Sequence, residues 1–266
     1  MLKSIPVFQD PRLFQIAALS SFLCYGLFQL GWDQDLQRIS VTIVFGLLTQ
    51  AFFTLKLRLP WSSMKSGLIT SLGLCLLFRS SEPMLWAAAP ILALSSKYLI
   101  QIEKRHFFNP ANLGVVLPIL LFGEGWISPG QWGNGTMMAF FFTAAAAMVL
   151  LKVGRIDTSL AFLLTFFGLE AIRSVLYLGW EWEWLFHKMT NGSILLFAFF
   201  MITDPKTTPN HPVSRILWAA AIGGLSFVLT SWFYLHTAPL WALFFASPVL
   251  VLLNYWKKAK SFEWSL

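Results

Sequence analysis

The stretch FFNPANLGVVLPILL, residues Phe107–Leu121, places an Asn-Pro pair and a second Asn at the head of an apolar run. Farther along, FFMITDPKTTP, residues Phe199–Pro209, places Asp-Pro and several Thr at the tail of another. A soluble protein keeps such proline-broken turns in surface loops. Beside long apolar runs in a membrane, irregular backbone is tolerated only where protein or a polar cavity covers it. The two stretches therefore indicate a membrane protein with interrupted helices.

The composition supports this interpretation. The chain has 266 residues, of which 57% are hydrophobic and 12% charged, whereas an average globular domain is roughly 25% charged. We expect an integral membrane protein whose main surroundings are the lipid bilayer. The N-terminal residues lack a short apolar core followed by a small-residue cleavage site, so we expect no cleaved signal peptide.

The apolar stretches define about ten transmembrane segments in an all-α fold. A full crossing needs about 17 to 25 residues. Stretches of this length lie at 12–31, 37–57, 84–102, 135–153, 157–179, 213–233 and 237–256. Shorter ones lie at 65–79, 111–123 and 190–203. Short spans bounded by Gly, Pro or polar residues are typical of discontinuous helices, so we expect short broken helices at those positions.

The basic residues predict the orientation. Ten segments with a cytoplasmic N-terminus place all but four of the 19 Lys and Arg on the inner side, as the positive-inside rule requires. The remaining four are Arg38, Arg79, Arg173 and Lys188. We expect a multi-pass protein of the inner cell membrane with both termini cytoplasmic. The Trp-bearing stretches GEGWISPGQWG and GWEWEW are expected to be outer loops that anchor at the interface.

An internal repeat organises the segments. SLGLCLLFRSSEP (Ser71–Pro83) aligns with SILLFAFFMITDP (Ser193–Pro205) at a constant offset of 122, with Glu82-Pro83 over Asp204-Pro205. Five crossings per half would make the halves run in opposite directions. The sequence therefore predicts one polytopic domain over 1–266, built from two inverted five-helix repeats at 12–123 and 135–256.

The two polar stretches supply the candidate binding residues, which are Asn109, Asn112, Thr203, Asp204, Thr207 and Thr208. They adjoin expected helix starts, where free N–H groups attract electron-rich oxygens and an Asn or Asp can bond a heteroaromatic ring edge or a polyol. The alternative is plain capping, because these residues are common N-caps and Pro110 suits a first helical position. Capping does not exclude ligand contact.

Other polar residues leave fewer options. Lys97 is either a functional charge near the membrane interior or a side chain that snorkels to the cytoplasmic surface. Glu170 and Arg173, three residues apart on one helix, are expected to neutralise each other rather than to line an ion path. The dispersed His and the two Cys predict no metal, haem or iron–sulfur site. No nucleic-acid-binding, hydrolase, P-loop or dinucleotide motif occurs.

These stretches, together with GLITSLGLCLL and ASPVLVLLNYW, resemble the membrane subunits NqrB and RnfD of the sodium-pumping NADH:quinone reductase and the Rnf complex. The resemblance covers the chain from about residue 40 onward and is nearest to stand-alone relatives, including those of enediyne clusters. It implies a ten-helix inverted-repeat fold and a flavoprotein that moves electrons within or across a membrane, with partner subunits or a redox partner protein.

The resemblance also implies the cofactor. We expect a non-covalent riboflavin or FMN between the Asn-Pro and Asp-Pro motifs, held by Lys97, Phe108, Asn109, Pro110, Asn112, Thr203, Asp204 and Thr207, with Phe107 and Phe108 available to stack on the ring. Many family members carry a second FMN esterified to Thr in an S-G-A-T motif. That motif is missing from this sequence, so we expect no covalent FMN. An inverted-repeat permease for a small molecule or ion, and an accessory protein of a biosynthetic cluster, are the alternative functions.

Overall fold

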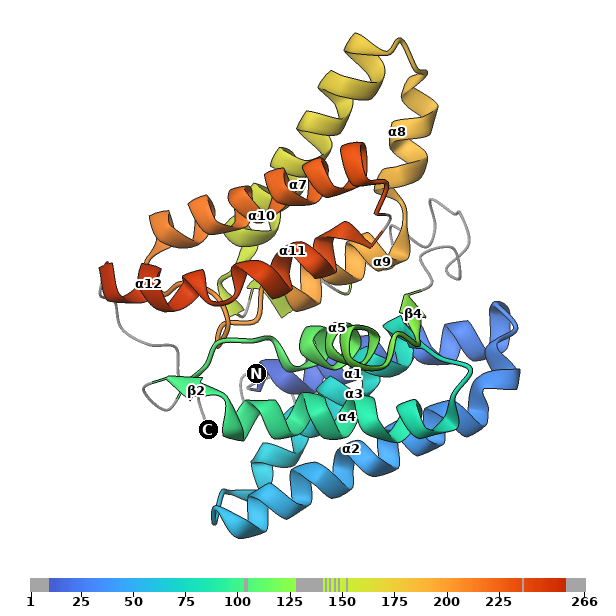
Figure 1. Ribbon diagram of the computed structural model, residues 1–266, viewed down its shortest axis with the longest axis vertical. Helices are drawn as coiled ribbons and strands as arrows, with labels where there is room; N and C mark the ends of the chain where they lie inside the picture. Colours follow the sequence, from blue (N-terminus) through green and yellow to red (C-terminus); the bar gives the residue numbers. More distant parts are fainter. Residues whose placement is uncertain are drawn as a thin grey trace, which may run out of the picture. The chain divides into compact units, whose positions relative to one another are not determined.

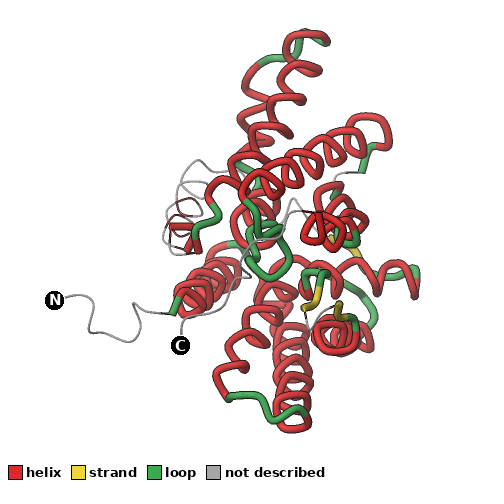
Figure 2. The backbone as a smooth tube through the Cα atoms, turned by 90° about the vertical axis from the view of Figure 1, so that its left-hand side faces the viewer, coloured by secondary structure: helices red, strands yellow, loops and turns green. Residues whose placement is uncertain are grey.

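The computed structural model describes residues 10–102, 105–127, 141, 143, 145, 147, 149–151, 153–235 and 237–256. These residues are almost entirely helical, with two short ladders of extended backbone (Figure 2). The chain divides into two compact units, the first up to residue 128 and the second over residues 129–262. The described part of the chain is therefore all-α, as predicted.

The first unit contains five helices. They are α1 (Pro11–Gln29), α2 (Leu36–Lys56), α3 (Met64–Leu77), α4 (Pro83–Leu99) and α5 (Pro110–Phe122), with 3-10 turns at Trp32–Asp35 and Trp61–Ser63 (Figure 1). Strand β1 (Phe78–Arg79) pairs antiparallel with β4 (Trp126–Ile127), and β2 (Gln101–Ile102) with β3 (Arg105–His106). Proline is the first residue of α1, α4 and α5, where its missing N–H costs nothing.

Successive helices of the first unit alternate in direction. Asp10, just before α1, pairs with Lys65 in the first turn of α3 at 2.8 Å, so these two helices start together. The hydroxyl of Thr42 on α2 donates to the Trp86 carbonyl at 3.2 Å, and farther along α2 the Gln50 amide donates to the Tyr98 hydroxyl on α4. Helices α2 and α4 are therefore parallel neighbours.

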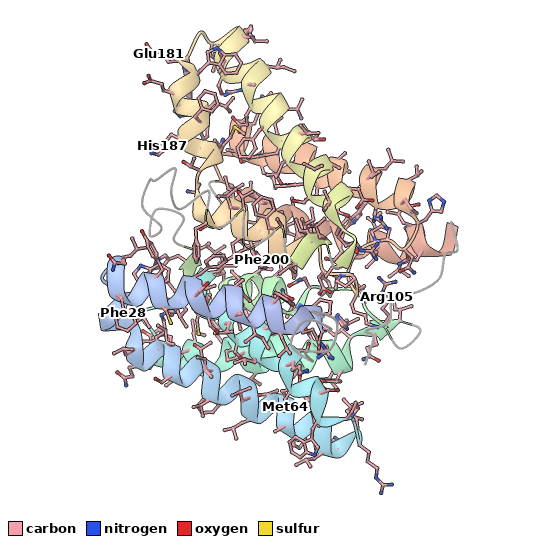
Figure 3. All side chains as sticks on the ribbon, turned by 180° about the vertical axis from the view of Figure 1, so that it is seen from behind. Phe28, Met64, Arg105, Glu181, His187 and Phe200 are labelled. Carbon is pink, nitrogen blue, oxygen red and sulfur yellow. The ribbon has the colours of Figure 1, made fainter. Side chains whose placement is uncertain are left out.

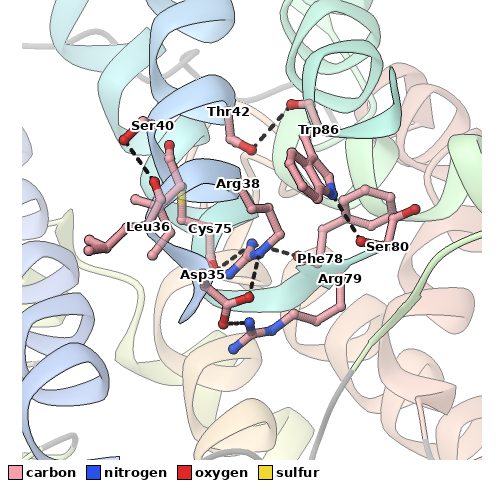
Figure 4. Close-up of polar contacts among 11 residues, drawn as sticks. Asp35, Leu36, Arg38, Ser40, Thr42, Cys75, Phe78, Arg79, Ser80 and Trp86 are labelled. Carbon is pink, nitrogen blue, oxygen red and sulfur yellow. Dashed lines mark hydrogen bonds and ion pairs between the residues drawn. The ribbon is translucent and has the colours of Figure 1, made fainter. Parts of the chain in front are cut away.

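A buried arginine closes the end of α3 (Figure 4). Arg38, at the start of α2, is 4% exposed and donates to the carbonyls of Cys75 and Phe78 at 3.2 and 2.8 Å. These carbonyls belong to the last turn, where α-helices leave acceptors unsatisfied. Asp35 accepts from Arg38 at 3.4 Å and also pairs with Arg79. Two arginines and one carboxylate thus join α2 to the end of α3.

The second unit repeats this pattern with different windings. Its elements are α7 (Ile156–Glu170), the π-helix η6 (Ala171–Tyr177), α8 (Trp182–Met189), α9 (Gly192–Leu196), the π-helix η7 (Phe197–Met201), α10 (Pro212–Phe233), α11 (Ala238–Ala246) and α12 (Val249–Trp256). The stretch GWEWEW, predicted as a loop, instead begins helix α8. The predicted single segment 237–256 is two helices, because Pro248 has no N–H to continue the ladder.

Helices α7 and α10 are parallel neighbours in the second unit. Arg215, in the first turn of α10, donates to Asp157, in the first turn of α7, at 2.7 Å. Eight residues along α10, a Cβ added at Gly223 would lie 3.0 Å from the Phe162 carbonyl. At the offset of 122, α2 corresponds to α7 with η6, and α4 to α10. The same pair is therefore parallel in both units, which supports the repeat, while its inversion stays a prediction.

Three helices among the described residues are long and apolar enough to cross a membrane, namely Leu36–Lys56, Ile156–Tyr177 and Pro212–Phe233. The short apolar helices predicted near 111–123 and 190–203 are confirmed as Pro110–Phe122 and Gly192–Met201. The segment 135–153 and the loop after Ile127 lie largely outside the described residues. The count of ten crossings stays a prediction.

Candidate functional site

The Asn-Pro motif forms a capped helix start in the first unit. The β2–β3 hairpin leads into Asn109, whose Oδ1 accepts from the backbone N–H of Asn112 at 3.1 Å. Pro110 occupies the first position of α5, and the Leu113 N–H donates to the Asn109 carbonyl at 2.9 Å. The predicted N-cap is confirmed, and it fixes the backbone from which Asn112 projects.

Asn112 is the polar group that capping does not explain. Its side chain is 1% exposed, and within the described part of the chain neither its Oδ1 nor its Nδ2 has a hydrogen-bond partner. A buried polar group without partners costs roughly 1–3 kcal/mol. A carboxamide presents a donor and an acceptor side by side, so this position suits a ligand with a matching acceptor and donor.

Aromatic side chains and a cation accompany the motif. The Phe107 and Phe108 rings are half-buried and contact each other, with centroids 4.7 Å apart and planes at 37°. Lys97 on α4 donates to the Ser66 hydroxyl on α3 at 2.9 Å, and its ammonium lies 5.2 Å from the Tyr98 ring centroid. Lys97 is therefore tied to the start of α3. Which of its two interpretations holds is a question of membrane depth.

The Asp-Pro motif forms a turn in the second unit. Asp204 accepts through Oδ1 from the Lys206 N–H at 3.0 Å, and its carbonyl accepts from the Thr207 N–H and the Thr208 hydroxyl at 3.0 and 3.1 Å. Thr203 donates to the Phe199 carbonyl at 2.7 Å. The capping prediction is wrong for Asp204, Thr207 and Thr208, because their groups close this turn.

The repeat shows where the turn comes from. At the offset of 122, Pro90 inside α4 corresponds to Pro212, the first residue of α10. The first two turns of α4, from Pro83, therefore correspond to the irregular residues 205–211. Thr and Asn compete with helical hydrogen bonds through their side chains, and KTTPNH is rich in them. One repeat winds this segment as helix, and the other opens it into a polar turn.

A π-helix precedes that turn. Phe197–Met201 are all buried, and the Ile202 N–H donates to the Phe197 carbonyl, five residues back, at 3.0 Å. Short π segments inside helices occur frequently at functional sites. The sequence offers no local signal for this winding, and it was not predicted.

The expected pair of Glu170 with Arg173 is wrong. Glu170 accepts from Lys188 on α8 at 2.6 Å, and the Arg173 guanidinium lies 5.6 Å from the Trp232 ring centroid. The π winding begins at Ala171. Because a π-helix has more residues per turn, a residue three positions on no longer faces the first. Residues 18 apart provide the ion pair instead.

In the described residues, no group of three or more His, Cys, Asp or Glu side chains could hold a metal ion. The polar chemistry of both motifs is that of amides, hydroxyls and one carboxylate. These groups suit an organic ligand with a hydrogen-bonding edge.

Taken together, the long apolar helices and the polar turns define an all-helical membrane protein. The chain belongs to the NQR2, RnfD, RnfE family, whose model matches residues 116–263, more than half of the chain. The match includes the Asp-Pro motif and begins just after the Asn-Pro motif. The family resemblance read from the sequence is confirmed.

Curated relatives are named as the D-type component of an ion-translocating oxidoreductase complex. The protein from Vibrio vulnificus (strain YJ016) is 30% identical over 142 residues, 53% of this chain and 37% of the relative. The protein from Shewanella frigidimarina (strain NCIMB 400) is 29% identical over 140 residues, with the same coverage. The protein from Stutzerimonas stutzeri is 34% identical over 85 residues, 32% of this chain and 24% of the relative. The chain thus matches well under half the length of these relatives.

Proposed function

We propose that this protein is a membrane electron-transport subunit that holds one non-covalent flavin, riboflavin or FMN, at its Asn-Pro motif. The observation that carries the proposal is the buried, unpartnered carboxamide of Asn112. Family membership supports the electron-transport part, because the relatives are named as subunits of oxidoreductase complexes.

The residues fit a flavin. The imide edge of the isoalloxazine ring has an N–H between two carbonyl oxygens, which complements the adjacent acceptor and donor of the Asn112 carboxamide. Asn109 holds the helix start in place through its cap, and Phe108 offers a ring for stacking. When bound, a flavin supplies reversible uptake and release of electrons. This chain's residues would orient the ring and keep water from its edge.

The proposal includes the Asp-Pro turn as a second contributor through Thr203, Asp204 and Thr207, and Lys97 as a nearby positive charge. It also includes the inverted ten-crossing arrangement in the inner cell membrane with cytoplasmic termini. Because the sequence lacks the S-G-A-T motif, a single flavin must exchange electrons with a separate subunit or redox protein. We therefore propose such a partner.

The experiment is the visible absorbance of the purified full chain in mild detergent, followed by cofactor extraction and chromatography. We expect the spectrum of an oxidised flavin and release of intact riboflavin or FMN. A colourless, folded preparation that takes up neither compound when both are added would refute the proposal and favour a permease.

A further inference from the structure

Glu170 is a buried carboxylate in a helix that is long and apolar enough to cross a membrane. It is 2% exposed, and its Oε1 accepts from the Lys188 ammonium at 2.6 Å. An ionised carboxylate away from water needs a counter-charge or a proton. Glu170 is the last residue of α7, directly before the π-helix η6.

The surroundings of the Lys188 ammonium form a cation site. Its Nζ lies 5.3 Å from the Phe166 ring centroid and 5.1 Å from the Trp184 ring centroid, in addition to its bond with Glu170. A carboxylate and two aromatic rings attract any cation at that point. In this structure the cation is one tethered to the chain.

A nearby hydroxyl is not explained by the ion pair. Ser174, four residues after Glu170 on the π-helix, is fully buried, and its Oγ has no hydrogen-bond partner among the described residues. Docking of α8 through Glu170 and Lys188 does not require this oxygen. A hydroxyl one turn away is, however, a suitable second oxygen ligand for a small cation.

Lys188 is held from outside the membrane-spanning helix. It belongs to the short helix α8, where Glu181 and His187 mark the two ends in Figure 3. Burial lowers the pKa of Lys188, the Arg173 charge lowers it further, and the contact with Glu170 opposes both. The other charged or titratable groups on α8 are Glu181, Glu183 and His187, all exposed. The ammonium therefore gives up its place or its proton more readily than an ordinary lysine.

We propose that Glu170, with the hydroxyl of Ser174, is an exchange site for a small monovalent cation, a sodium ion or a proton, in which Lys188 is the tethered resident. One positive charge replaces another, so the carboxylate stays neutralised while Lys188 moves away. This site lies wholly within the second unit and does not depend on flavin binding.

The test removes the tethered cation. In the purified full chain, Lys188→Met leaves Glu170 without its partner. If the incoming cation is sodium, the Tm of this variant rises by roughly 2–4 °C in sodium chloride relative to choline chloride at equal ionic strength. If it is a proton, the variant shows the infrared band of a protonated carboxyl at neutral pH. Either signal disappears in the double variant Glu170→Gln/Lys188→Met.

Two further variants make the result decisive. Ser174→Ala in the Lys188→Met background reduces the sodium shift or moves the carboxyl band, whereas Glu183→Gln, an exposed acid on α8, leaves both unchanged. Lys188→Gln, which keeps a hydrogen-bond donor, replaces Lys188→Met if the latter does not fold. An ionised Glu170 with no difference between sodium and choline in the folded variant overturns the proposal.

Discussion

The amide of Gln50 on α2 donates to the hydroxyl of Tyr98 on α4 at 2.6 Å, in the interior of the first unit. Gln50 is fully buried, and its Nε2 also donates to Thr54 at 3.2 Å. This bond fixes the register of the two parallel helices that define the unit.

Replacing Tyr98 by Phe should destabilise the protein by about 1 kcal/mol, because one donor of a buried amide loses its acceptor. Thermal unfolding in detergent measures this. Tyr177→Phe, at a position 83% exposed, is the matched control and should change little. Equal losses in both variants would show that the Gln50–Tyr98 bond has no special weight.

Asn112→Leu should act in opposite directions on stability and on cofactor content. Removing an unpartnered polar group from the interior raises the Tm of the flavin-free protein, and flavin retention falls about tenfold to hundredfold, the equivalent of 1–3 kcal/mol. Flavin-to-protein ratio and Tm are measured on the same preparation, with Glu183→Gln as control. Retention at the control level in Asn112→Leu would argue against this residue as the flavin contact.

Asp204→Ala and Asn109→Ala should also lower flavin retention, but with a loss of stability. Asp204 closes the turn to Lys206 and Asn109 caps α5, so each deletion removes a bond of the fold, with a cost of about 1 kcal/mol for the cap. Their Tm values should fall where that of Asn112→Leu rises. The sign of the Tm change therefore separates a supporting residue from a ligand contact.

Acid should weaken the junction of α1 with α3. Burial would raise the pKa of Asp10, but hydrogen bonds from Arg12 and Lys65 outweigh it and lower this pKa to about 2. A lowered carboxyl pKa gives stability that is complete above about pH 4 and is lost as the pH falls towards 2, roughly 2 kcal/mol in all. Unfolding measured across this range should show the loss in the wild type and not in Asp10→Asn.

No covalent FMN is expected. Of the two Thr that could act as cryptic acceptors, Thr136 lies outside the described residues, and the Thr190 hydroxyl donates to the His187 carbonyl at 3.0 Å. Denatured protein on a gel should be dark under ultraviolet light, even when the native preparation is yellow. A fluorescent band at the mass of the chain, surviving acid precipitation, would restore a two-flavin relay.

Hydropathy and proline positions were enough to predict the long helices and the Asn109 cap. The bounds of α2 and α10 agree with 37–57 and 213–233 to within a residue, because apolar length and helix-start chemistry are local properties. Helix α8 was missed because its Trp and charged residues are equally typical of an interfacial loop.

The windings and the ion pairs could not be predicted. The π-helices η6 and η7 depend on packing around them, and the contact of Glu170 with Lys188 joins residues 18 apart. Spacing along one helix favoured Arg173 for this role. The lack of a partner for Asn112 is likewise visible only once the surrounding side chains are in place.

The bonds from Arg38 to the carbonyls of Cys75 and Phe78 also constrain how the protein is made. While α2 alone has left the ribosome, its arginine lacks these acceptors, and the end of α3 lacks its donor until α2 is beside it. Neither helix is satisfied by itself in lipid. The α2–α3 hairpin is therefore the unit that enters the bilayer, and a nascent chain arrested before Phe78 should stay with the insertion machinery.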